Sequence, residues 1–137
     1  MLAKRIDLGS KPLGLWDSEV ELEKGRLVKL ENQKVVYATS DQDAMGFCTL
    51  RIETNEGGEL TDHNTIPKGK KPVIYTLDKN DIWLTTECDG IEKLNIGDKV
   101  TCGAEGKLKK AEDDALFEVT EITKAAGVPA VGVRVLK

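Results

Sequence analysis

Short runs in which alternate residues are apolar constrain the fold of this chain more than any other feature of its sequence. The clearest runs are 47–52, 73–77 and 131–135. A period of two is typical of a β-strand with one face buried. Segments rich in glycine, proline, asparagine or aspartate separate such runs, at 55–58, 67–69 and 78–81. The pattern predicts a mainly all-β fold, a small barrel or sandwich of short antiparallel strands.

Two parts of the chain resemble each other. LEKGRLV at 22–28 matches LNIGDKV at 94–100 in its leucine, glycine and valine, and the match continues to 41 and 114 after an insertion in the second copy. Each copy predicts a turn at the glycine, a strand, a polar turn and a second strand. The sequence therefore predicts two similar hairpin units, 22–41 and 94–114, as an internal repeat within a single β-rich domain that spans 19–137.

One segment fits two interpretations. Apolar residues in 108–126 fall at helical spacing, at Leu108, Ala111, Ala115, Val119, Ile122 and Ala126. Alanine, lysine and glutamate favour a helix there, whereas the alternating run 117–123 and its place in the repeat favour strands. A short helix near 108–126 therefore stays as the alternative to strands.

Composition and charge exclude several classes of protein. The 137 residues are enough to form a core, and 20 Lys and Arg against 24 Asp and Glu give a net charge of −4, which opposes binding to nucleic-acid phosphates. The longest weakly polar run, 125–133, is broken by Pro129 and two glycines, and a bilayer span needs about 20 apolar residues. The sequence therefore predicts no nucleic-acid or membrane partner. The first residues lack a secretory signal, so we expect synthesis in a cytoplasm.

The residues that catalysis or metal binding requires are scarce. His63 is the one histidine, and it lies in a polar stretch typical of a loop. Cys48, Cys88 and Cys102 have no C-x-x-C spacing, so free, largely buried thiols are expected. The glycines at 103 and 106 lack the spacing of a phosphate-binding loop. The sequence predicts no catalytic, cofactor-binding or metal site, and no enzyme.

The pattern as a whole resembles the head decoration and structural proteins of tailed bacteriophages. The resemblance rests on LEKGRLVKLENQKVVYAT at 22–39 and DAMGF at 43–47, and further on IGDKV at 96–100, GKL at 106–108 and VGVRVL at 131–136. These phrases of glycine, hydrophobic residue and turn recur along small all-β domains of that family. The resemblance covers 20–137.

The resemblance implies a virion structural protein without enzymatic activity that binds the outside of a capsid. Its implied partner is the major capsid protein, and its implied state is a homo-oligomer, with a trimer favoured. Residues 1–18 lack periodicity and are expected to form an extended N-terminal arm. In the family a terminal arm contacts the shell, which makes candidate partner contacts of Leu2, Lys4, Arg5, Leu13, Leu15 and Trp16.

A second hypothesis keeps the fold and changes the partner. A small β-barrel can bind a glycan or a receptor, and exposed tryptophans commonly stack on sugar rings. The candidates for that surface are Trp16 and Trp83.

Overall fold

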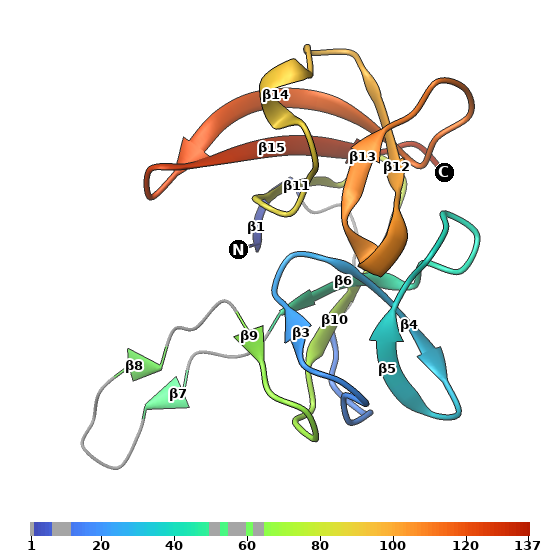
Figure 1. Ribbon diagram of the computed structural model, residues 1–137, viewed down its shortest axis with the longest axis vertical. Helices are drawn as coiled ribbons and strands as arrows, with labels where there is room; N and C mark the ends of the chain where they lie inside the picture. The colour runs from blue at the N-terminus through green and yellow to red at the C-terminus, as the bar shows by residue number, and fades with distance from the viewer. Residues whose placement is uncertain (1, 7–11, 50–52, 55–59, 62–64) are drawn as a thin grey trace.

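Two antiparallel sheets, one above the other, form the body of the molecule (Figure 1). The computed structural model describes residues 2–6, 12–49, 53–54, 60–61 and 65–137. The six-stranded sheet has the order β1-β11-β15-β14-β12-β13, formed by Leu2–Ile6, Ile82–Thr85, Val128–Val135, Phe117–Ala125, Lys99–Cys102 and Leu108–Lys110. The five-stranded sheet has the order β2-β10-β6-β4-β5, formed by Pro12–Leu13, Val73–Thr76, Gly46–Thr49, Leu27–Glu31 and Lys34–Tyr37.

Smaller elements complete the described part of the chain. Two ribbons of two strands each pair β3 with β9 and β7 with β8, formed by Leu22–Glu23, Thr65–Ile66, Glu53–Thr54 and Leu60–Thr61. The helical segments of the described residues are two short turns of 3-10 helix, η1 (Ile91–Lys93) and η2 (Ala104–Gly106). The all-β prediction is therefore confirmed, and the architecture is a sandwich of sheets rather than a closed barrel.

The alternative of a helix near 108–126 is wrong. Leu108–Lys110 forms β13 and Phe117–Ala125 forms β14, which pairs along its length with β15. The alternation of β-branched and polar residues in 117–123 therefore outweighs the helical spacing, because each strand gains a partner. The predicted runs 73–77 and 131–135 correspond to β10 and β15, and 47–52 corresponds to β6 as far as Thr49, beyond which 50–52 lie outside the described residues.

The prediction of two similar hairpins is confirmed, and the likeness extends well beyond them. Apart from the two small ribbons, the strands of 12–76 are, in chain order, β2, β4, β5, β6 and β10, and those of 82–135 are β11, β12, β13, β14 and β15. Both sets place the first strand beside the fifth, then the fourth, the second and the third. We call 12–76 the first unit and 82–135 the second unit. The chain is thus a tandem pair of five-stranded units, with β1 as an additional strand.

Backbone hydrogen bonds repeat from unit to unit. Gly25 and Gly97 share a φ of 96°, a conformation that glycine adopts without strain. The amide of Gly25 donates to the carbonyl of Cys48, as that of Gly97 does to Val119, both at 2.9 Å. These bonds tie the turn before the hairpin to the fourth strand in each unit.

The outer strand of each hairpin is covered in the same way. The amide of Val35 in β5 donates to the carbonyl of Asp17 at 2.9 Å, and the amide of Leu108 in β13 donates to Glu87 at 3.1 Å. Parallel bridges accompany both contacts. Each unit therefore protects its hairpin edge with the segment that leads into it, which leaves that edge less open to unwanted strand pairing.

The first unit packs against the second through one face of its five-stranded sheet. We call this its back face, and the opposite face its front face. Cross-strand neighbours Leu27, Phe47 and Tyr75 form the back face of the first unit and pack into the core of the second. There Phe47 meets Phe117 and Trp83, with ring centroids 5.5 Å and 5.8 Å apart. Aromatic groups of this size bury a large apolar area. The main hydrophobic core is therefore shared between the units.

The same positions on the back face of the second unit are charged. When the strands of the two units are aligned by their register, Lys99, Glu118 and Arg134 occupy the positions that Leu27, Phe47 and Tyr75 occupy in the first unit. These three charged residues also lie side by side across three strands. Glu118 accepts hydrogen bonds from Lys99 at 2.6 Å and from Arg134 at 3.1 Å. Terminal units of stacked repeats commonly carry such a polar outer face.

A smaller core lies on the front of the first unit. Val28, Cys48 and Ile74 are fully buried there beneath Leu22 and Ile66 of the β3–β9 ribbon. The β3–β9 ribbon thus covers the front of the first unit much as the first unit covers the second. Both units are closed by apolar contacts on their front faces.

Candidate interaction surface

Large apolar side chains that remain exposed are the first guide to an interaction surface. In the described part of the chain they are Leu15, Val20, Ile96, Ile122 and Val128, with exposed fractions of 68%, 41%, 71%, 40% and 50%. Two of the five, Ile122 and Val128, belong to the β14–β15 hairpin. The others are distributed over segments outside that hairpin.

The described residues of the predicted arm include two strands, one in each of the two main sheets. β1 pairs with β11, which places Leu2 opposite Thr85 and Lys4 opposite Trp83, and Arg5 lies in the same strand. Leu2 packs against the shared core. The part of the arm at 7–11 lies outside the described residues. Residues 2–6 are therefore an edge strand of the six-stranded sheet.

The remaining arm residues lie at the first unit. Leu13 in β2 pairs with Ile74, and Trp16 packs half-buried against the smaller core. Leu15 is the one large arm side chain of 12–18 that is mostly exposed. The structure thus places Leu2, Lys4 and Arg5 in β1 of the six-stranded sheet, and Leu13, Leu15 and Trp16 in or directly after β2 of the five-stranded sheet.

The β14–β15 hairpin projects beyond the sheet to which it belongs (Figure 1). β12 pairs with β14 at Lys99↔Glu118 and Val100↔Phe117, and β11 pairs with β15 only through 131–134. Beyond its pairing with β12, β14 pairs with β15 alone, and from 123 to 130 the two strands form a ribbon that neither β11 nor β12 flanks. A bulge between Val119 and Glu121 marks the start of this projection. Bulges of this kind bend a strand and redirect the residues beyond them.

A two-residue turn closes the projecting ribbon. Ala126 and Gly127 have φ values of 51° and 81° between the paired residues Ala125 and Val128, which is a type I′ turn. Ala126, Gly127, Val128 and Pro129 are all exposed. The projecting end of the hairpin is therefore both apolar and accessible.

Trp83 cannot form the sugar-stacking surface of the second hypothesis. Its side chain is 1% exposed and packs between Phe47 and Tyr75, with the Tyr75 ring centroid 5.2 Å away. The prediction that it is exposed is wrong, because residues distant in sequence enclose it. Trp16 is half-buried.

The cysteines are in the state expected from the sequence. Cys48, Cys88 and Cys102 are free and buried, which confirms that prediction. Burial raises the pKa of each thiol to about 12. They stay protonated at neutral pH and are therefore weak nucleophiles.

Other residues considered for chemistry give no assembled site. In the parts of the chain that can be described, His, Cys, Asp and Glu form no group of three that could hold a metal ion. The same residues contain no helix long and apolar enough to cross a bilayer. His63 lies outside them.

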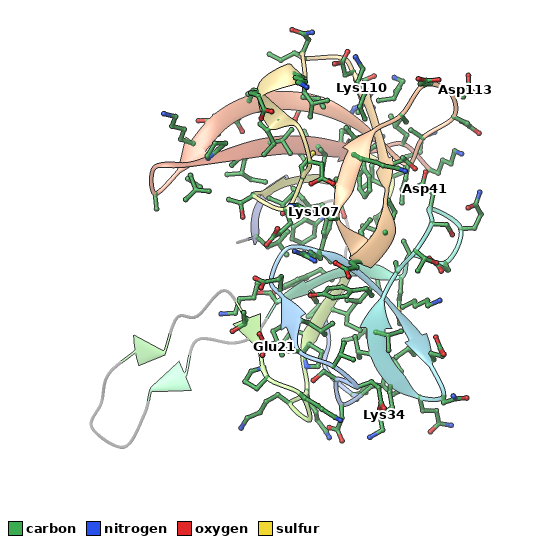
Figure 2. The ribbon with its side chains drawn as sticks, in the orientation of Figure 1. Glu21, Lys34, Asp41, Lys107, Lys110 and Asp113 are labelled. Carbon is green, nitrogen blue, oxygen red and sulfur yellow. The ribbon has the colours of Figure 1, made fainter. Side chains whose placement is uncertain are left out.

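Acidic side chains instead serve structural contacts. Asp41 lies beside the β12–β13 hairpin (Figure 2) and accepts hydrogen bonds from the hydroxyl of Thr101 at 2.5 Å and the amide of Cys102 at 2.7 Å. Asp43 orders its own loop: burial acts to raise its pKa, but hydrogen bonds from Thr39 and Ser40, with Lys29 nearby, lower it to about 2. Neither carboxylate faces a partner across a cleft, as acid-base catalysis requires.

Comparison with solved structures identifies the fold. The head fiber gp8.5 N base of bacteriophage phi29 is similar over 98% of this chain and 94% of that one, with a TM-score of 0.54 and 13% identity. The chain has the fold of a phage head protein. The gene product 12 C-terminal fragment of the same phage is similar over 93% of this chain and 99% of that one, with a TM-score of 0.50 and 17% identity. No protein-family model and no curated protein sequence matches.

The resemblance expected from the sequence therefore holds at the level of the fold. Sequence reasoning overlooked the projecting hairpin as a surface, although a signal for it was present. The run 125–133 contains no charged residue in a chain of which 32% is charged. The proline and glycines of this run argue against a membrane span, but its lack of charge also indicates an apolar hairpin end.

Proposed function

We propose that this chain is a non-enzymatic virion structural protein that binds and stabilises the outer surface of a phage capsid. The observation that carries the proposal is the similarity of nearly the whole chain to a phage head fiber base. The net charge of −4 is compatible with an exterior position, away from packaged nucleic acid. Its partner would be the major capsid protein.

Stabilisation of a shell suits a protein of this kind. A protein present in many copies on a lattice gains from many weak contacts that act together, so it needs neither a deep pocket nor an activated nucleophile. The buried thiols with raised pKa values agree with a role that involves no thiolate chemistry. We further propose that the chain acts as a homo-oligomer, with a trimer as the favoured state.

The test uses heads that lack the protein. Purified protein is mixed with such heads and co-sedimented, and the heat resistance of decorated and undecorated heads is compared. Binding that saturates at a fixed number of copies, together with greater heat resistance, is the expected result. Absence of binding combined with equal heat resistance would overturn the proposal. Light scattering coupled to size exclusion measures the oligomeric state of the free protein.

A further inference from the structure

We infer that the β3–β9 ribbon is an autoinhibitory cover: it occupies on the first unit the place where a unit of a second copy would dock, and so prevents copies from stacking head to tail. The inference concerns contacts between copies and does not depend on the proposed function. Its basis is the tandem repeat, because the second unit already shows how a unit docks on a front face. The front face of the second unit is the one that receives the first unit.

The front faces of the two units are built alike. Three buried residues of each face lie at matching register positions on three neighbouring strands: Val28, Cys48 and Ile74 in the first unit, and Val100, Val119 and Val133 in the second. On the second unit this face receives the apolar back face of the first unit, within the shared core. The first unit therefore carries an apolar face of the same pattern, for which the chain itself holds no further unit.

A longer connection supplies the cover that the first unit needs. The fourth and fifth strands of the second unit are joined by the turn 126–127, whereas those of the first unit are joined by 50–72. β9 comes from this longer connection, and its Ile66 is fully buried in the smaller core. Leu22 of β3 has a buried counterpart in Leu94 of the second unit, but Ile66 has none, because the corresponding connection is a tight turn. The added cover thus belongs to the unit whose front face no other unit covers.

Hydrogen bonds fasten the segment after β9 to the rest of the first unit. The amide of Ser18 donates to the carbonyl of Lys70 at 2.8 Å, and its hydroxyl donates to the carbonyl of Pro67 at 2.9 Å. The amide of Gly69 donates in turn to the carbonyl of Ser18 at 3.0 Å. Ser18 is buried, so these bonds are shielded from water. The cover is therefore fixed in place over the front face.

The unit that the ribbon excludes is the second unit of another copy, whose back face is free. That back face carries Lys99, Glu118 and Arg134, which would lose water without gaining partners on an apolar front face. Stacking between copies is therefore opposed at both ends of the chain, by charge on the second unit and by the ribbon on the first. Stacked repeats need such terminal caps, and a closed oligomer needs them too, because head-to-tail contacts that do not close produce filaments.

The experiment first removes the charge, so that the ribbon is left to oppose stacking. The background is the triple variant Lys99→Leu, Glu118→Phe and Arg134→Tyr, which gives the second unit the back-face residues of the first. In this background, Ile66→Lys places a charge at a fully buried position and opens the ribbon. Thr65→Lys is the matched control, because Thr65 is half-buried in the same strand and accepts the lysine without opening the ribbon.

Light scattering coupled to size exclusion measures the mass as a function of protein concentration. In the triple background, we expect Ile66→Lys to associate at a concentration about tenfold lower than either the triple variant itself or its Thr65→Lys derivative. Ile66→Lys in the otherwise natural chain should keep the mass of the wild type, because the charged back face does not enter the opened front face. Equal association of the three chains with apolar back faces would overturn the inference. Association of Ile66→Lys to the same extent with and without the triple change would also overturn it.

The thiol of Cys48 reports whether the ribbon has opened. Cys48 lies beneath the ribbon in the smaller core, whereas Cys88 and Cys102 belong to the main core. Ile66→Lys should therefore make one thiol accessible to a thiol reagent while the far-UV circular dichroism stays native. An opened ribbon without the expected rise in mass in the triple background would show that the inference is wrong. If Ile66→Lys unfolds the chain, Ile66→Ala, which removes the buried anchor without adding a charge, makes the same comparison with the same expected order.

Discussion

At the scale of single residues, Gly106 shows how closely the two units approach. Its amide donates to the carbonyl of Ala38 at 2.8 Å, across the boundary between the units. A Cβ at this position would lie 2.0 Å from the carbonyl oxygen of Leu27, and φ is +69°. Glycine is therefore required twice, once by the dihedral angle and once by the neighbouring backbone.

Replacing Gly106 by alanine should lower the free energy of unfolding by about 3 kcal/mol or more, from left-handed strain and the backbone clash combined. Gly69→Ala is the matched control, because Gly69 also has a positive φ, +86°, but open space around its Cβ position. That control should lose about 1–2 kcal/mol. Urea titration measures both values, and equal losses would show that the close approach costs nothing.

The carboxylate of Asp43 makes stability depend on pH. Its pKa is lowered from 3.8 to about 2 in the folded chain, so the unfolded chain binds a proton more readily. Its contribution is therefore complete above about pH 4 and is lost as the pH falls towards 2. The difference in urea midpoint between wild type and Asp43→Asn should shrink over that interval. A difference that stays constant from pH 6 to pH 2 would contradict this assignment.

At the scale of elements, the loop after β5 connects the first unit to a hairpin of the second. Asp41 accepts hydrogen bonds from the Thr101 hydroxyl and the Cys102 amide of β12. This contact joins a loop of the first unit to a strand of the six-stranded sheet. Asp41 therefore helps to fix how the two hairpins lie against each other.

Asp41→Ala should lower the free energy of unfolding by about 1–3 kcal/mol, because the two donors of β12 lose their acceptor. Asp113→Ala serves as the control, since Asp113 is exposed in the loop before β14. Guanidinium titration followed by far-UV circular dichroism compares the two variants. Equal midpoints would remove Asp41 from the contacts that hold the units together.

Strands and turns were predictable where a local pattern decides them. β10 and β15 follow directly from alternation, and both β4–β5 and β12–β13 follow from the repeated glycine and valine. The segment at 117–125 was ambiguous because its apolar residues fit both periods. The pairing of β14 with β15 decides it in favour of a strand, and such a partner is not visible in the sequence of β14 itself.

At the scale of the whole molecule, the shared core makes the two units one folding unit. Phe47 of the first unit packs against Trp83 and Phe117 of the second. Unfolding of either unit alone would expose the apolar core of the other unit to water. We therefore expect cooperative unfolding in a single transition.

The fluorescence of Trp83 and the far-UV circular dichroism should report the same unfolding midpoint. Trp16→Phe leaves Trp83 as the single tryptophan, within the shared core. Coincident curves are expected because sheet and core are lost together. Two separated midpoints would show that the units unfold independently.

The full extent of the duplication was not predictable from the sequence. The match between 22–41 and 94–114 survives because turns keep their glycines. The equivalence of Leu27 with Lys99, and of Phe47 with Glu118, cannot be recognised in the sequence. Leu27 and Phe47 are buried between the units and are apolar, whereas Lys99 and Glu118 face solvent and are charged. The burial of Trp83 was missed for the same reason, since its neighbours come from the other unit.

The ion pairs of Lys99, Glu118 and Arg134 also limit how far such units can stack. If these positions were apolar like their counterparts in the first unit, every chain would end in a surface shaped to enter another chain. Copies crowded at high local concentration could then exchange units head to tail, and such growth does not close on itself. The charged face therefore acts as a stop against filament formation.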